Sequence, residues 1–309
     1  MHPSIKLLAC AGALLLAGRA AAHGQDDINL TGVIDFHVHA GPDSVERAID
    51  ADDLARLAKS MGMRGMVLKS HWDKTSAMAY LMRKEVPGIE LFGGVTSDIS
   101  NGGINIEGVK RMADMKGGYG RVVWLPTFDN ETPAKVANHR PYVSVSENGK
   151  LRPEVLALID YFATRPELVL ETGHVTPQEG LMVVHEAHAR GVKHIVVTHA
   201  MGSRWTVAQM QEGARDGAYM EFVYHGTLGT RPAQTIAQYA DAMKQVGYDH
   251  CIMATDLGDV HTSPPPPYPL EPQGFLQFMQ EMHKAGVSVA DINRMSKTNP
   301  ALALGLPPN

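Results

Sequence analysis

Eight short segments rich in valine, isoleucine and leucine recur along the chain, and their alternation with helical segments restricts its fold more than any other feature. These segments are Gly32–His39, Arg64–His71, Ile89–Ser97, Arg121–Asp129, Leu168–His174, Val192–His199, Tyr219–His225 and His250–Asp256. Most of them are nearly continuous apolar runs, which is typical of parallel strands buried on both faces. We therefore interpret them as the strands of one parallel sheet.

Amphipathic segments between these strands predict helices. They include Glu46–Met61, Pro153–Arg165 and Pro177–Arg190, the last two with proline at the start, where helices tolerate it. Eight strand–helix units predict an α/β fold, a (β/α)8 TIM barrel in a single domain. The alternative, an open doubly wound sheet, needs a glycine-rich phosphate turn after the first strand, and His37–Gly41 is not one.

The N-terminal segment has the pattern of a secretory signal peptide. Lys6 precedes the apolar run Leu7–Gly18, and Ala20–Ala22 forms a small-residue cleavage site. The apolar run is too short to span a bilayer. We expect cleavage after Ala22, a barrel domain over residues 23–309 without a membrane anchor, and a periplasmic or secreted location.

Export would also remove Cys10 and leave Cys251 as the lone cysteine of the mature chain. Cys251 lies in an apolar run, where a free cysteine behaves as a small buried hydrophobe.

The charge balance limits the class of partner. The chain has 28 Lys and Arg against 33 Asp and Glu, a net charge of −5, and no block of basic residues. A nucleic-acid binder held by phosphate contacts needs the opposite sign, so this class is largely excluded. We expect a small-molecule substrate, and the sequence is compatible with a homo-oligomer.

Histidines collect at the downstream ends of the predicted strands. In a barrel these ends meet on one face, where the active site is built. Asp256 ends the eighth strand, and six of the 15 histidines end the others: His37, His39, His71, His174, His199 and His225.

The pair His37 and His39 suggests a metal site. Residues i and i+2 of a strand point the same way, so both imidazoles would face the barrel interior. With His174 and Asp256 they supply three nitrogens and one carboxylate, a suitable shell for Zn²⁺ or a similar divalent metal. Asp35 could orient a ligand from behind.

Lys69 would point into the same interior. An ammonium group beside a dication is repelled unless it is neutralised by burial or converted by CO2 into a bridging carbamate. The alternatives are a carbamylated bridge, a positive contact for the substrate, and an ammonium group that extends to solvent.

These residues resemble the amidohydrolase superfamily of metal-dependent barrel hydrolases. The resemblance runs over the whole mature chain and rests on strands one, five, six and eight. The matching segments are Val33-Ile34-Asp35-Phe36-His37-x-His39, Glu171-Thr172-Gly173-His174, Val196-Val197-Thr198-His199-Ala200, Ala254-Thr255-Asp256 and the C-terminal Asn299-Pro300-Ala301-x-x-Leu304-Gly305-Leu306.

The resemblance implies a metal-activated water that attacks a polarised carbonyl or phosphoryl centre. It implies that His37, His39 and His174 hold the metal and that Asp256 binds it and takes the proton of the water. His199 would bind a second metal or polarise the substrate.

One feature departs from the two-metal members, which usually carry a bridging carbamylated lysine or a glutamate on strand four. The fourth strand here has neither; Asp129 could substitute as a fallback bridge but falls late, in the loop. Some members bridge from strand two, where Lys69 stands. The choice is between one metal ion and two ions bridged by carbamylated Lys69, and we favour the second.

Three functions compete. The first is an exported hydrolase that cleaves an amide, lactone or other ester bond. The second is a one-metal decarboxylase or C–C hydrolase of the kind used in aromatic-acid degradation, with Lys69 as a cation near a substrate carboxylate and His199 as general acid or base. The third is a non-catalytic periplasmic barrel that binds metal or solute, which would have no need of the proton acceptor Asp256.

Four residues are candidates for contacts with the substrate. Arg204, just beyond His199, could bind an anionic group with its planar fork. Trp124 could stack on a ring, and His71 and His225 follow strands two and seven at the same face.

Overall fold

The computed structural model describes residues 28–260 and 269–308. The predicted signal peptide, residues 1–22, lies outside the described residues. Among the helices of the described part, none is both long and apolar enough to cross a membrane.

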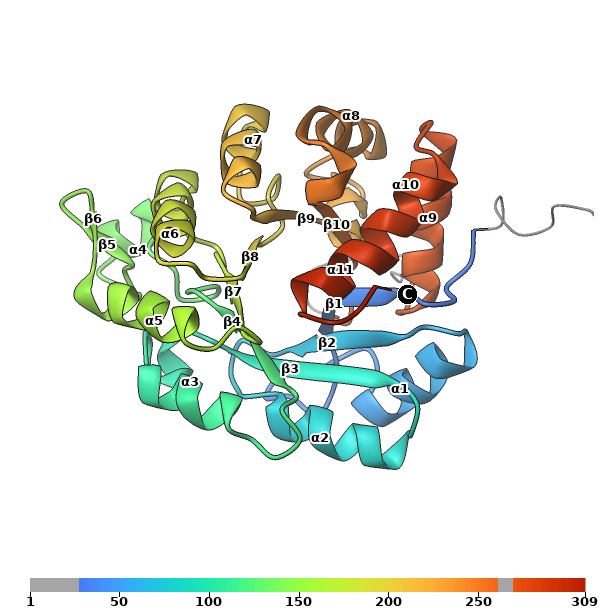
Figure 1. Ribbon diagram of the computed structural model, residues 1–309, viewed down its shortest axis with the longest axis horizontal. Coiled ribbons are helices and arrows are strands. Elements are labelled where there is room, and N and C mark those ends of the chain that lie inside the picture. Colours follow the sequence, from blue (N-terminus) through green and yellow to red (C-terminus); the bar gives the residue numbers. More distant parts are fainter. Residues whose placement is uncertain (1–27, 261–268, 309) are drawn as a thin grey trace, which may run out of the picture.

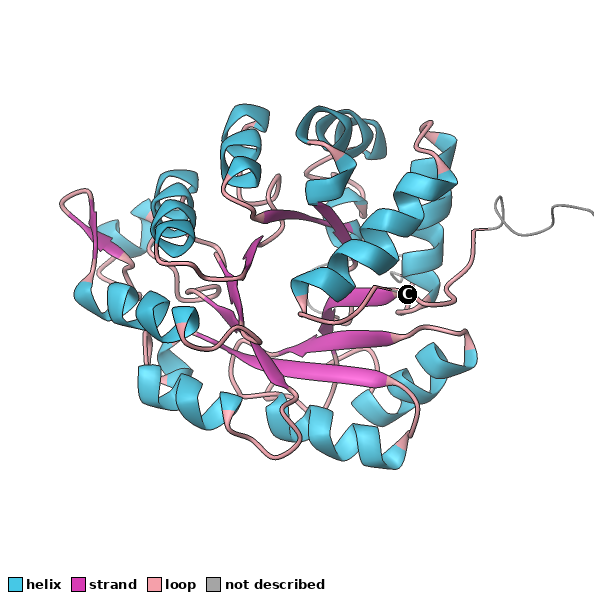
Figure 2. Cartoon of the chain, viewed as in Figure 1, coloured by secondary structure: helices cyan, strands magenta, loops and turns pink. Residues whose placement is uncertain are grey.

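Eight parallel strands form one sheet in the order β1-β2-β3-β4-β7-β8-β9-β10. The strands are drawn in magenta, with helices around them, in Figure 2. They are β1 (Ile34–His39), β2 (Gly65–Lys69), β3 (Glu90–Thr96), β4 (Gly120–Trp124), β7 (Val169–Glu171), β8 (His194–Val197), β9 (Tyr219–Val223) and β10 (Cys251–Ala254). The remaining two strands, β5 (Ser146–Glu147) and β6 (Lys150–Leu151), form a small antiparallel hairpin. All eight predicted strands are present, which confirms the (β/α)8 barrel.

Two backbone hydrogen bonds join the last strand to the first. The amide of Asp256 donates to the carbonyl of His37 (2.8 Å), and the amide of His39 donates to the carbonyl of Leu257 (2.9 Å). The ring of strands is therefore completed at the two segments that carry the histidine pair and the aspartate.

Helices surround the ring of strands (Figure 1). They are α1 (Ala51–Ser60), α2 (Ser76–Glu85), α3 (Ile106–Ala113), α4 (Pro133–Ala137), α5 (Pro153–Ala163), α6 (Pro177–Ala189), α7 (Val207–Arg215), α8 (Ile236–Val246), α9 (Gln273–Lys284), α10 (Val289–Asn293) and α11 (Asn299–Ala303). Short 3-10 turns at Ile99–Asn101, Tyr224–Thr227 and Tyr248–His250 and a π-helical turn at Arg294–Thr298 connect them.

The apolar interior has two parts. The larger lies between the strands and the outer helices and contains Cys251, which is a free, fully buried cysteine as expected. The smaller fills the inside of the barrel, and it includes Ala301 and Ala303 of α11 and Leu304 directly after this helix. The strand residues of this inner core are Ile34, Phe36, Val67, Phe92, Val122, Trp124, Val169, Val196, Val223, Ile252 and Ala254.

The predicted boundaries need correction at the catalytic face. Most strands end two or more residues before the expected position, so that His71, His174, His199, His225 and Asp256 lie on the connections just beyond them. The first helix begins at Ala51 rather than Glu46, because the preceding loop is held by a backbone bridge between Gly41 and Asp50.

Candidate metal centre

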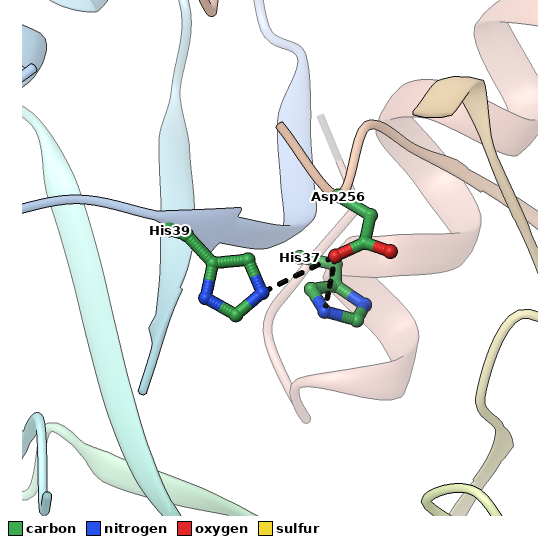
Figure 3. Close-up of side chains that lie close together, drawn as sticks. All are labelled: His37, His39 and Asp256. Carbon is green, nitrogen blue, oxygen red and sulfur yellow. Dashed lines mark ion pairs between the residues drawn. The ribbon is translucent and has the colours of Figure 1, made fainter. Parts of the chain in front are cut away.

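Side chains from the first and last strands converge on one point at the C-terminal end of the barrel. Nε2 of His37 lies 3.0 Å from Oδ1 of Asp256, and Nε2 of His39 lies 3.2 Å from the same oxygen (Figure 3). Ligand atoms around a tetrahedral zinc ion are about 3.4 Å apart. Both histidines are buried, and Asp256 takes a left-handed backbone conformation (φ +54°) that non-glycine residues rarely adopt. These three residues fit a divalent cation.

The partners of the two imidazoles determine which nitrogen is free to bind. Nδ1 of His37 lies 3.2 Å from Oε2 of Glu221, and Nδ1 of His39 lies 3.0 Å from the carbonyl oxygen of Lys69. Both partners accept hydrogen bonds, so each Nδ1 carries the proton and donates it. The Nε2 lone pairs are then directed at Asp256, as in metal sites where a carboxylate or carbonyl orients each histidine.

The electrostatics of this group suit a cation. Burial opposes the charging of His37, but the carboxylates of Asp256 and Glu221 outweigh it and raise the pKa of His37 to about 10. Burial would raise the pKa of Asp256, yet His37 and His39 hold that pKa well below its usual value. For His39 burial dominates and lowers the pKa to about 4. Two anionic carboxylates therefore face the histidines, and a proton on His37 can be replaced by a metal ion.

His174 and His199 form a second group. Their Nε2 atoms are 2.9 Å apart, and the rings of His37 and His199 stack with centroids 6.0 Å apart. The hydroxyl of Ser203 donates to the carbonyl of Thr198 (3.1 Å) and accepts from Nδ1 of His199 (3.2 Å). Nδ1 of His199 therefore carries the proton, and the lone pair of its Nε2 is directed at His174.

The surroundings keep the second pair neutral. Burial lowers the pKa of His199 to about 4 and, with His199 and Lys69 nearby, also lowers the pKa of His174. His199 has φ +26°, a strained conformation of the kind that collects at functional sites. Two facing imidazoles suit a second cation that has at least one further ligand.

Lys69 lies beside the first group. Its Nζ is 3.0 Å from Nε2 of His37 and 5.4 Å from the ring centroid of Trp124, and its side chain is almost completely buried. Burial lowers the pKa of Lys69 below its usual value. A neutral amine at this position is the form that reacts with CO2.

Sequence reasoning missed two buried carboxyl groups below the histidines. Glu221 of β9 accepts from Nδ1 of His37 and, at 2.9 Å, from the backbone amide of His199, so it touches both groups through one oxygen. Glu171 of β7 accepts from the hydroxyl of Thr198 (2.7 Å). A carboxylate inside an apolar strand segment was the signal available for both.

Asp35 acts on the backbone rather than on a histidine ring. Its Oδ1 accepts from the amides of His37 (3.1 Å) and Thr255 (3.0 Å), and the Thr255 hydroxyl donates to its other oxygen. Burial raises the pKa of Asp35 to about 7, against the hydrogen bonds from Thr255 and His37, which lower it. Asp35 thus holds Thr255, the residue before Asp256, against β1, which carries His37 and His39.

The predicted substrate residues fall in different places. His71 is partly buried, and its ring stacks on His39 at a centroid distance of 5.2 Å. His225 lies 4.0 Å from Oδ2 of Asp256. Trp124 is fully buried in the inner core, which does not favour stacking on a substrate, and Arg204 is exposed on the loop after His199.

A cavity of about 370 Å³ opens beside Asp256 and His199. Its walls include His199, His225 and Asp256 from the site and Arg231 from the loop after β9, whereas Arg204 is not among the residues that line it. Asp129, the fallback bridge, accepts from the amide of Ile99 and lies on the wall of a different cavity.

A family model described as a family of unknown function, DUF6282, matches residues 32–221. The chain belongs to this family. The matched region contains His37, His39, Lys69, His174 and His199, and it ends at Glu221, before the strand that leads to Asp256. No curated protein sequence matches the chain.

Solved structures resemble the whole barrel. The organophosphorus hydrolase of Deinococcus radiodurans superposes with a TM-score of 0.59 at 14% identity and covers 91% of this chain and 98% of its own. A second match, with the same values, is described as molecular engineering of organophosphate hydrolysis activity from a weak promiscuous lactonase template. At this identity the likeness shows the barrel fold alone.

Proposed function

We propose that the protein is a metal-dependent hydrolase that cleaves an ester, lactone or amide bond of a small molecule. The observation that carries the proposal is the convergence of His37, His39 and Asp256 on one point at the catalytic face of the barrel. The names of the structurally similar proteins, an organophosphorus hydrolase and a lactonase template, support hydrolysis of an ester-type bond on this fold.

A divalent cation bound by these residues would polarise the oxygen of the scissile bond and lower the pKa of water. The two oxygens of Asp256 can divide the remaining work. Oδ1 faces both histidines, while Oδ2 lies toward His225 and the cavity. Oδ2 is therefore placed to accept the proton of the attacking water. His199, on the cavity wall, can hold the second cation or polarise the substrate.

We propose further that Lys69 bridges two metal ions as a carbamate. Its neutral amine would attack CO2 to form a C–N bond and release one proton, which turns a neutral amine into an anionic carbamate next to His37. Among the described residues, His174 and His199 come with no third histidine, cysteine or carboxylate close enough to complete a metal site. A carbamate on Lys69 would supply that ligand.

Metal analysis of the purified protein tests the bridge. We expect two ions per chain in the wild type and one or none in Lys69→Ala, with Lys150→Ala on the β6 hairpin as an exposed control. After incubation with ¹³C-bicarbonate, the carbamate carbon should appear by NMR in the wild type and be missing in Lys69→Ala. An unchanged metal content in Lys69→Ala would contradict the bridge.

One observation favours the second candidate, a one-metal decarboxylase or C–C hydrolase. The three-donor group His37, His39 and Asp256 is complete without Lys69, and an unmodified lysine would be a cation near the substrate. One ion per chain in the wild type, with no carbamate signal, would support this candidate.

Hydrolysis itself is tested with Asp256→Asn. We expect the variant to fold and to lose about 10²–10⁴-fold in kcat/KM on a panel of esters, lactones and amides, because the proton acceptor is lost. Asp53→Asn on α1, an exposed carboxylate, should retain wild-type activity. Equal activity of Asp256→Asn and wild type would remove Asp256 from the mechanism. A metal-loaded wild type without activity on any substrate would favour a non-catalytic binding barrel.

We also propose export, on the apolar run Leu7–Gly18 and the small residues that follow it. N-terminal sequencing of the protein from a periplasmic or culture fraction should begin at His23. An N-terminus at Met1 in the cytosolic fraction alone would contradict export.

A further inference from the structure

Asp98, Thr127 and His71 form a hydrogen-bonded chain beside the candidate metal ligands. The Thr127 hydroxyl lies 2.5 Å from Oδ2 of Asp98 and 2.7 Å from Nδ1 of His71. Asp98 and Thr127 are fully buried, and the three residues follow β3, β4 and β2 respectively. A buried chain of this kind has to satisfy every donor and acceptor in it.

The acceptors in this chain determine where its protons lie. Oδ1 of Asp98 already accepts from the backbone amides of Thr127 (2.9 Å) and Asp129 (2.8 Å). The Thr127 hydroxyl therefore donates its single proton to Oδ2 of Asp98. Its lone pairs face His71, so Nδ1 of His71 must be the donor in the second bond. In a neutral ring with hydrogen on Nδ1, the second nitrogen, Nε2, is an acceptor.

We propose that this chain holds His71 in the tautomer with hydrogen on Nδ1, so that Nε2 accepts a hydrogen bond from the substrate. The substrate class follows from this chemistry: a molecule with an N–H or O–H group next to the scissile bond, such as a secondary amide or a hydroxy ester. The substrate part of this inference rests on the proposed hydrolase function.

The position of the ring supports a contact with substrate. His71 stacks on His39 at 5.2 Å and meets His174 edge-on at 6.1 Å, so it lies against a member of each metal group. Its side chain is 18% exposed, whereas Asp98 is inaccessible. Trp72 and Phe128 lie beside the ring, and Phe128 is itself largely exposed. The partly exposed ring of His71 thus lies next to a histidine of each metal group.

His71 does not complete a metal site in this arrangement. Among the described residues, the group with three donor atoms close to one another is His37, His39 and Asp256. With one ring nitrogen fixed by Thr127, His71 therefore has its second nitrogen available for another partner. A site built around one buried acceptor discriminates strongly against analogues that lack the matching donor.

The tautomer is measured directly by ¹H–¹⁵N correlation spectra of histidine-labelled, metal-loaded protein. We expect the Nδ1–H form in the wild type and in Thr127→Ser, which keeps the hydroxyl. Thr127→Val removes the acceptor at nearly constant shape and should shift His71 toward the Nε2–H form. An Nε2–H form in the wild type, or the same tautomer in wild type and Thr127→Val, would overturn the inference. The wild-type spectrum decides even if Thr127→Val does not fold.

Donor recognition is tested with probes that need not be hydrolysed. N-methylacetamide, which has an N–H group, should shift the His71 Nε2 resonance of the wild type, and N,N-dimethylacetamide should not. Equal shifts, or a shift from neither probe, would refute the substrate contact. These spectra are independent of turnover, so a failure to find hydrolysis would count against the proposed function alone.

For a secondary amide that the protein hydrolyses, we expect kcat/KM to exceed that of its N-methylated analogue by tenfold or more. In Thr127→Val this ratio should fall toward one, mainly through KM. A ratio that is unchanged in Thr127→Val would contradict a recognition role for His71.

Discussion

At the scale of single residues, the clustering of the candidate ligands could be predicted from the sequence, and the residues that support them could not. His37, His39 and Asp256 stand at strand ends, where the pattern of a parallel barrel brings side chains together. Glu221 and Glu171 stand inside strands, and their function depends on which atoms surround them. Spacing along the chain carries no information on those neighbours.

The carboxylate of Glu221 should set the metal affinity of both groups. Glu221→Gln keeps the shape but weakens the bond that holds the Nδ1 proton of His37, so we expect metal affinity to fall about 10–100-fold. Competition with a chelator measures this affinity. Glu85→Gln, an exposed carboxylate on α2, is the control. Unchanged affinity in Glu221→Gln would show that His37 is oriented by other contacts.

Glu171 should make stability depend on pH. Burial, with Glu221 nearby, raises its pKa to about 8, so between about pH 4.5 and 8 the folded chain holds a proton that the unfolded chain has lost. Its contribution to stability is therefore complete below about pH 4.5 and is lost as the pH rises through 8. Glutamine does not titrate.

This pH dependence is measured as the difference in melting temperature between Glu171→Gln and the wild type, with a chelator present. We expect this difference to become more positive from pH 5 to pH 9, by an amount equivalent to about 1–3 kcal/mol. A difference that stays constant over this range would place the pKa of Glu171 near that of an ordinary glutamate.

At the scale of elements, the existence and order of the strands were predicted, while their ends were not. The apolar pattern identifies β8 and β10, but it cannot show that His199 and Asp256 turn into left-handed backbone conformations just beyond them. Tertiary bonds set these ends, such as the one from the Asp256 amide to His37. At the catalytic face, the tertiary contacts of the site therefore determine where strands end, rather than the local β-propensity of the sequence.

The short helix α11 fills the inside of the barrel, so its buried face should matter for stability. Leu304, which follows the helix, is fully buried in the inner core, whereas Leu302 of α11 is 40% exposed. We expect Leu304→Ala to lower the free energy of unfolding by about 2–5 kcal/mol. Leu302→Ala should cost about 0.5 kcal/mol or less. Urea denaturation measures both, and similar costs for the two variants would contradict the role given to α11.

At the scale of the whole molecule, closure of the barrel makes the site. His37 and Asp256 are far apart in sequence, yet they meet because β10 returns to β1 and bonds to it at the two positions that carry these residues. The fold class followed from the repeated strand–helix pattern. The inner core could not be foreseen in the same way. The sequence pattern places Trp124 at a strand end near the site, whereas in the structure its side chain packs inside the barrel.

Anomalous diffraction from crystals of the full chain grown with zinc would locate the metal ions. We expect one anomalous peak bound by His37, His39 and Asp256, and a second between His174 and His199 close to Lys69. Zinc found only at surface histidines such as His185, with the barrel group empty after saturation, would contradict this expectation.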